Sequence, residues 1–141
     1  MNLWAWISLA VAIAGIGWFG FKHEKAEQAR ALRHMAGRPA LDPQQFGDHY
    51  FASSQAAIGA RLRKLLAEYF PIDLSSLHPD DALVDDLRMD SFDSMATVEF
   101  VIAIEKEFGI VIPNAAAKDM RTLRDIADFV ATTLKNKPSA S

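Results

Sequence analysis

The chain has 141 residues, of which 50% are hydrophobic, so it is long enough for one folded domain and an apolar appendage. It contains no cysteine, which excludes a disulfide framework, a thiolate metal site and a cysteine nucleophile. The formal net charge is -3 and the acidic residues are concentrated in the C-terminal part, which argues against a nucleic-acid-binding protein.

The first predicted element is an uncharged apolar run at residues 3–21, LWAWISLAVAIAGIGWFGF. A helix of this length crosses a hydrocarbon core of about 30 Å, and tryptophans lie near both of its ends, as is common at membrane interfaces. A cleaved signal peptide fits less well, because no basic residues precede the run and no small-x-small site follows it. A buried core helix is the other alternative, but so short a chain has little protein to bury it. We therefore expect an uncleaved transmembrane helix.

Basic residues follow this run, and only Met1 and Asn2 precede it. Because lysine and arginine stay on the cytoplasmic side, we expect a single-pass protein of the inner (cytoplasmic) membrane, with its N-terminus outside and the rest of the chain in the cytoplasm. The basic residues either form a solvated helical face or contact anionic head groups. Good helix formers predict that the helix continues past the membrane until Gly37 and Pro39, so residues 1–38 are assigned to the anchor and juxtamembrane helix.

Residues 39–54 contain two prolines and a glycine and show no sustained hydrophobic period. They are interpreted as a linker. Phe46, Tyr50 and Phe51 are too apolar for a freely flexible tether, so we expect them to pack on the folded domain, with the membrane surface as the alternative site.

Residues 55–135 are expected to form the folded domain. The first helix carries apolar residues at steps of three and four, and Pro71 ends it. An irregular connection then leads to a second helix, which begins in the serine-containing stretch and ends at Gly109. Its expected apolar face consists of Met95, Val98, Val101, Ile102, Ile104 and Phe108.

A short third helix is expected at residues 115–120. Thr122 and Asp125 predict a capping box that opens the final helix, and residues 136–141 are expected to be a disordered tail. The predicted fold class is therefore all-α, with an N-terminal transmembrane helix followed by a four-helix bundle that has enough core to fold by itself.

The start of the second helix is the candidate site. A serine at a helix N-terminus lies beside unpaired backbone N–H groups and the positive end of the helix dipole, which suits a phosphate ester. Residues 93–113, DSMATVEFVIAIEKEFGIVIP, resemble without a gap the pattern DSL-x-x-VEL-x-x-x-LE-x-x-F-x-x-x-IP of acyl carrier proteins. The upstream LVDDL at residues 83–87 resembles the family's F-x-EDL, and the resemblance spans residues 58–134.

The resemblance implies a carrier, not an enzyme, in which a serine bears a covalent 4'-phosphopantetheine arm. Two serines compete for this role. Ser91 has the family's spacing from Leu87, whereas Ser94 is in register with everything downstream. Choosing Ser91 would insert three residues into the helix, while choosing Ser94 places them in the loop, where length changes cost little. We predict attachment at Ser94, with Ser91 as the fallback, and the resemblance implies that Asp93 helps to position the magnesium ion of the transferase.

Partners are predicted from charge and from the resemblance. Between Asp73 and Glu107, ten carboxylates accompany only two basic residues, so we expect a negative face that docks on basic patches. Acidic residues that merely aid solubility are the alternative. The resemblance implies a phosphopantetheinyl transferase, an acyl-loading enzyme and acyltransferases as partners. The residues expected to recognise them are Met95, Val98, Glu99 and Glu105.

Other chemistry has little support in the sequence. The four histidines are scattered without the spacing of metal ligands, so no metal site is predicted. Neither serine lies in a G-x-S-x-G elbow, which argues against a serine hydrolase. The prediction is a membrane-anchored acyl carrier protein that delivers acyl thioesters to enzymes of lipid or lipophilic-metabolite synthesis. The alternative is an unmodified carrier-like scaffold or interaction module at the membrane.

Overall fold

The structure is a computed structural model that describes residue 26 and residues 28–70, 72–88 and 94–137. The transmembrane helix expected at residues 3–21 lies outside these residues, as do Ser91, Asp93 and residues 138–141 of the expected tail. Across the described ranges, no helix has both the length and the apolar character needed to cross a membrane.

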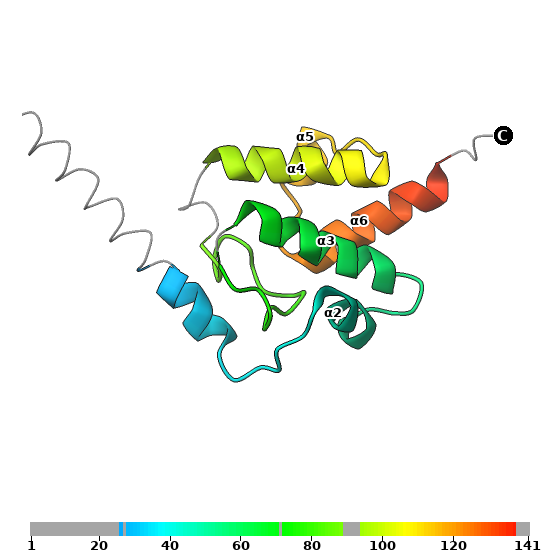
Figure 1. Cartoon of the computed structure of the whole chain (residues 1–141). Coiled ribbons are helices and arrows are strands. Elements are labelled where there is room, and N and C mark those ends of the chain that lie inside the picture. Colours follow the sequence, from blue (N-terminus) through cyan, green and yellow to red (C-terminus); the bar gives the residue numbers. More distant parts are fainter. Residues whose placement is uncertain (1–25, 27, 71, 89–93, 138–141) are drawn as a thin grey trace, which may run out of the picture.

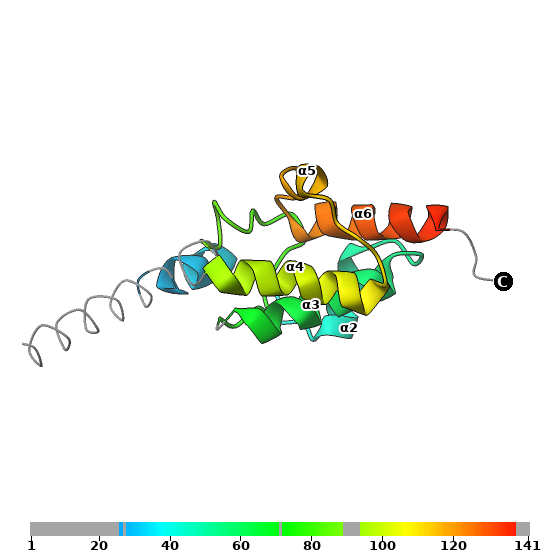
Figure 2. The same ribbon diagram turned by 90° about the horizontal axis from the view of Figure 1, so that it is seen from above.

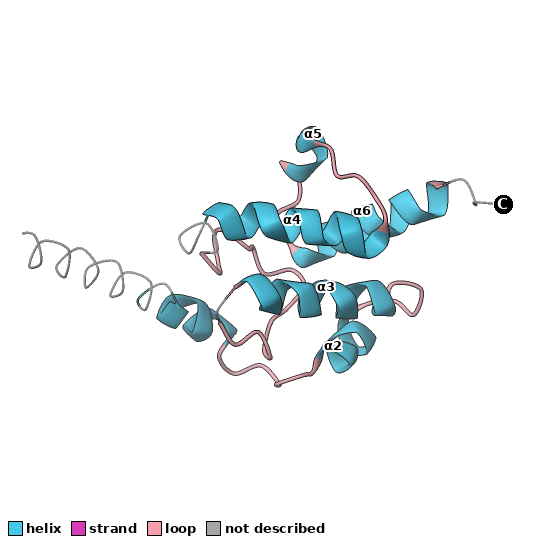
Figure 3. Cartoon of the chain, turned by 45° about the horizontal axis from the view of Figure 1, so that its top comes forward, coloured by secondary structure: helices cyan, strands magenta, loops and turns pink. Residues whose placement is uncertain are grey.

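All regular elements in the described residues are helices, apart from an isolated antiparallel bridge between Ala82 and Thr122 (Figure 3). In addition to a helical segment at residues 28–35, the elements are α2 (Pro43–Tyr50), α3 (Ala56–Tyr69), α4 (Ser94–Phe108), α5 (Asn114–Ala117) and α6 (Leu123–Asn136). The four helices predicted for the folded domain correspond to α3, α4, α5 and α6. Helix α3 packs against α2, α4 and α6 and so lies at the centre of the fold (Figure 1).

Helix α2 lies inside the segment that the sequence analysis assigns to a linker. Asp42 caps it with a capping box, in which the side chains of Asp42 and Gln45 each accept a hydrogen bond from the other's backbone N–H. The expected packing of the aromatic residues is confirmed, because Phe46 and Phe51 are buried in the core. Two turns of helix are too short to show a hydrophobic period, which explains why the sequence pattern did not reveal α2.

A glycine allows α2 to approach α3 closely. A Cβ atom at Gly47 would collide with the backbone carbonyl oxygen of Ala56 and crowd the Ala60 side chain. The absence of a side chain at Gly47 therefore permits the close contact between α2 and α3. Through this contact the segment expected to be a linker packs on the bundle.

Helix α4 buries a narrower face than its sequence predicts. Its buried side chains recur every four residues: Ala96, Phe100, Ile104 and Phe108. Met95 and Val98, which were predicted to contact partners, are 59% and 52% exposed, and Ile102, which was expected on the same broad apolar face, is 43% exposed. Because the neighbouring helices cover only one side of α4, these apolar residues form a surface stripe.

The predicted end of α4 and start of α6 are confirmed, whereas α5 (Asn114–Ala117) ends before residue 120, where the sequence analysis ended the third helix. Gly109 follows α4 with a φ of 63°, in the left-handed region that ends helices. Before α6, Thr122 and Asp125 form the expected capping box, with the Asp125 backbone N donating to Thr122 Oγ1 at 3.1 Å. Local signals thus define the C-terminal end of α4 and the N-terminal end of α6, which lie on either side of α5 in the chain.

Candidate functional site

The candidate site lies at the N-terminus of α4, of which Ser94 is the first residue. The 15-residue helix directs the N–H groups of its first turn and the positive end of its dipole toward this end. Ser91 and Asp93 lie outside the described residues, so the choice between the two serines and the role of Asp93 remain predictions.

The surface beside this helix start is apolar with an acidic neighbour. Met95, Val98 and Ile102 follow one another at steps of three and four residues, so they line one exposed stripe. Glu99 is exposed next to it. Three of the four predicted recognition residues are therefore accessible to a partner. Ile102 joins them, although the sequence pattern placed it in the core.

Glu105, the fourth predicted recognition residue, has an intramolecular role in the structure. Its carboxylate accepts a hydrogen bond from the backbone N of Ile112 at 2.8 Å, and its backbone carbonyl accepts one from Ile110 at 3.1 Å. These bonds fold the chain back after α4. The side chain is half-buried, so less of it remains available to a partner than at Glu99.

Part of the negative face expected between Asp73 and Glu107 is engaged in contacts inside the molecule. Asp90 and Asp93 lie outside the described residues. Asp85 and Glu99 are exposed, and no ion pair involves either of them in the part of the chain that the structure describes. Four carboxylates form pairs with arginine or histidine: Asp80 with Arg124, Asp81 with Arg38, Asp86 with His34 and Glu107 with Arg61.

Asp81 is the most buried of these acids, with 4% of its side chain exposed. It accepts hydrogen bonds from two Arg38 nitrogens at 2.6 and 2.9 Å, from His34 Nε2 at 3.1 Å and from the His78 backbone N at 2.9 Å. Burial alone would raise the pKa of Asp81, but the hydrogen bonds from Arg38, His78 and His34 outweigh it and hold that pKa below its usual range.

His34, Asp81 and Asp86 are also near enough to one another to surround a cation. The guanidinium of Arg38 already supplies positive charge to both oxygens of Asp81. We therefore interpret this cluster as an ion-pair network that holds two parts of the chain together.

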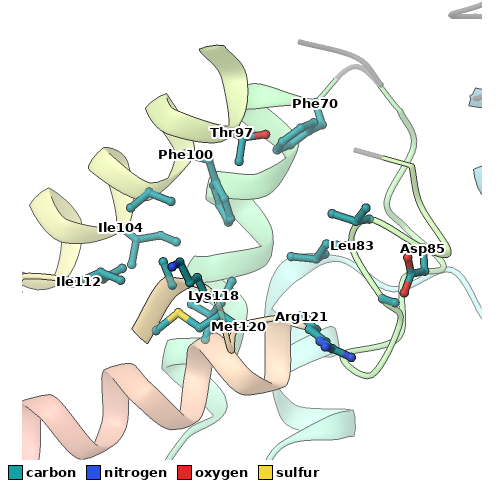
Figure 4. Close-up of a pocket in the computed structure, with 15 residues that line it drawn as sticks. Phe70, Leu83, Asp85, Thr97, Phe100, Ile104, Ile112, Lys118, Met120 and Arg121 are labelled. Carbon is teal, nitrogen blue, oxygen red and sulfur yellow. The ribbon is translucent and has the colours of Figure 1, made fainter. Parts of the chain in front are cut away.

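An apolar cavity of about 540 Å³ lies between α4, α5, α6 and the connection before α4 (Figure 4). This volume is within the range of about 300–1,000 Å³ that is common for small-molecule sites. The apolar part of its wall includes Phe70, Phe100, Val101, Ile104, Ile112 and Ile126. The sequence gives no sign of this cavity, because its walls come from segments far apart in the chain.

Polar groups lie at the edge of the cavity. Thr97, in the first turn of α4, is one of its lining residues, as are Asp85, Lys118 and Arg121. Because residues three apart share a helix face, Thr97 lies one turn along α4 from Ser94. A flexible group attached at Ser94 therefore has a short route into the cavity.

Comparison with known proteins adds to this geometry. Residues 60–130 match the family described as "Phosphopantetheine attachment site". Over 77 residues the chain is 32% identical to a protein named "Acyl carrier protein" from Thermosynechococcus vestitus (strain NIES-2133 / IAM M-273 / BP-1), a match that covers 55% of this chain and 91% of the relative. The site fits a phosphopantetheine arm, since the N-terminal end of a helix can accept a phosphate ester and residues of the same helix line an apolar cavity. The chain therefore belongs to the acyl carrier protein family: it is a carrier with a covalent 4'-phosphopantetheine arm, and it is not an enzyme.

Proposed function

We propose that this protein is a membrane-anchored acyl carrier protein that bears its arm on Ser94 and delivers acyl thioesters to enzymes of lipid or lipophilic-metabolite synthesis. The observation that carries the proposal is the position of Ser94 in α4, three residues before Thr97 of the cavity wall. Ser91 is the alternative attachment residue.

The chain supplies a binding site for the phosphate of the arm and an apolar cavity for the acyl chain. When bound, the arm holds an acyl group as a thioester on its terminal thiol. The N–H groups of the first turn of α4 stabilise the phosphate ester. Phe100, Val101 and Ile104 offer apolar surface to an acyl chain, and each methylene that leaves water for this surface contributes about 0.8 kcal/mol.

Residues 3–21 are the proposed membrane anchor, with the N-terminus outside and the carrier domain in the cytoplasm. The uncharged apolar run and the basic residues after it support this topology. Anchoring raises the concentration of the carrier near membrane-bound acyltransferases without any new contact between them.

The proposed partners are a phosphopantetheinyl transferase, an acyl-loading enzyme and acyltransferases. The exposed Met95 and Val98 offer them an apolar contact, while Asp85 and Glu99 attract a basic patch at its edge. Asp93 is proposed to help to position the magnesium ion of the transferase. Because several nearby acids are already paired internally, we expect docking to depend on these few charges.

Intact-mass measurements test the attachment site. Full-length protein coexpressed with a broad-specificity transferase is expected to gain one arm, and so is the Ser91→Ala variant, whereas Ser94→Ala is expected to stay unmodified. Modification that survives Ser94→Ala would move the site to Ser91. A wild-type chain that never gains an arm would instead favour the unmodified scaffold.

Membrane fractionation tests the anchor separately. The full-length chain is expected to stay with membranes after an alkaline carbonate wash, and a chain that lacks residues 1–21 is expected in the supernatant. Recovery of both chains in the supernatant would contradict anchoring and leave the carrier function untouched.

A further inference from the structure

The helical segment at residues 28–35 is part of the core of the carrier domain. Ala31 is 0% exposed and Met35 is 2% exposed, and both belong to the same hydrophobic cluster as the bundle helices. The two residues are four apart, so they share one face of the helix. On the other sides, Leu32 is 45% exposed and Arg33 is exposed. The segment that leads out of the proposed anchor is therefore docked on the bundle.

Polar contacts fix this docking. Arg38 binds the buried Asp81 with two hydrogen bonds, and its backbone carbonyl accepts a hydrogen bond from Ser76 Oγ at 3.2 Å. His34 adds a contact to Asp81 at 3.1 Å. Each of these bonds joins two residues that are separated by between 38 and 47 positions in the sequence. They hold the start of the described chain to the connection that precedes α4.

The docked helix lies at the same end of the molecule as the N-terminus of α4. Both views place residues 28–35 and the start of α4 on the same side of the molecule, while the C-terminal end of α6 lies on the opposite side (Figures 1 and 2). The contact between His34 and Asp86, at 3.6 Å, places the helix beside the last part of the connection that leads to Ser94.

The number of residues between the apolar run and the docked helix limits the distance of the bundle from the membrane. Between Phe21, at the end of the apolar run, and Gln28 the chain advances seven residues, which span at most about 24 Å when fully extended. If residues 22–54 were all a flexible tether, the bundle could move more than about 100 Å from the anchor. The 15 residues of α4 put its far end about 22 Å from Ser94, so the two ends of the bundle lie at different heights wherever the axis of α4 is inclined to the membrane.

We propose that docking of residues 28–38 holds the carrier domain at the membrane surface with its Ser94 end toward the lipid, so that it serves partner enzymes embedded in or bound to the membrane. This inference rests on the proposed anchor at residues 3–21. The outward-facing Leu32 and Arg33 suit this position, because an apolar and a basic side chain can meet the head-group region together. A carrier held in this way cannot follow a partner deep into the cytoplasm.

The absence of cysteine allows single labels to test this orientation. Full-length protein expressed without a transferase, its mass confirming that no arm thiol is present, receives a cysteine at Val84 or at Lys135. Val84 is exposed and precedes Asp86 by two residues, whereas Lys135 is exposed near the C-terminal end of α6. Each variant is labelled with a small fluorophore and reconstituted into phosphatidylcholine–phosphatidylglycerol vesicles that contain lipids with nitroxide head groups.

We expect quenching at position 84 to be at least threefold stronger than at position 135. Adding Arg38→Ala and Met35→Ala, with folding checked by circular dichroism, should bring the two labels close to equal quenching. Equal quenching in the otherwise unchanged protein would overturn the fixed orientation while leaving the anchor intact. Protein that fails to sediment with the vesicles would overturn the anchor and this inference together. If the Arg38→Ala and Met35→Ala variant does not fold, the comparison of quenching at positions 84 and 135 in protein without these two replacements still tests the orientation.

Discussion

Replacement of Met35 tests whether the helix at residues 28–35 is structural. Met35 is 2% exposed within the hydrophobic core, and truncation of such a methionine to alanine costs about 2–5 kcal/mol. We expect the lower half of this range, about 2–3 kcal/mol, because the helix lies at the edge of the bundle and its neighbours can partly close the gap. Leu32→Ala is the matched control. Leu32 lies on the same helix but is 45% exposed, so its replacement should change stability by about 0.5 kcal/mol or less.

The assay is urea unfolding of the full-length variants in detergent, followed by circular dichroism. All three tryptophans lie in residues 1–21, so tryptophan fluorescence would not report on the bundle. With a urea slope of about 1–3 kcal/mol per molar, a loss of about 2–3 kcal/mol in Met35→Ala should lower the unfolding midpoint by about 0.7–3 M. Equal midpoints for Met35→Ala and Leu32→Ala would refute the conclusion that this helix belongs to the core.

Three further predictions concern the network, the α2 contact and the cavity. The pKa of Asp81 is depressed in the folded state. Its contribution to the free energy of unfolding is therefore present above the ordinary aspartate pKa of 3.8 and is lost as the pH falls through the lower folded value. Urea midpoints that decline equally with falling pH in wild type and Asp81→Asn would contradict this. Gly47→Ala should destabilise by about 1–3 kcal/mol, since the new Cβ collides with the Ala56 carbonyl, and unchanged thermal unfolding would rule that out. Ala117→Trp should narrow the cavity, so a bound acyl thioester should hydrolyse faster than on the wild-type carrier while the circular dichroism spectrum stays the same.

The four helices of the carrier domain were predictable because local signals determine their ends. Thr122 and Asp125 form the capping box that their spacing predicts, and Gly109 has the left-handed conformation expected after a helix. The presence of α4 was also predictable, since the sequence analysis placed a helix from the serine-containing stretch to Gly109 and α4 spans Ser94–Phe108. Each of these features depends on residues within a few positions of one another.

The features that were not predicted depend on contacts between distant residues. Arg38 and Asp81 are 43 positions apart, so nothing local in either segment indicates that the juxtamembrane helix docks on the bundle. The exposure of Ile102 is a similar case. Its spacing fits an apolar helix face, but whether that face is covered depends on where the neighbouring helices lie.

The packing of α4 also bears on the choice between the two serines. Ala96, Phe100, Ile104 and Phe108 are buried at four-residue intervals, which fixes the rotation of the helix about its axis. Thr97 then lines the cavity, and Ser94 precedes it by three residues, a rise of about 4.5 Å. If the helix continued back to Ser91, that residue would be six positions from Thr97, at about 9 Å along the axis. An arm on Ser94 would therefore start about one turn from the cavity wall, and we propose Ser94 as the attachment residue on this ground together with the downstream sequence pattern.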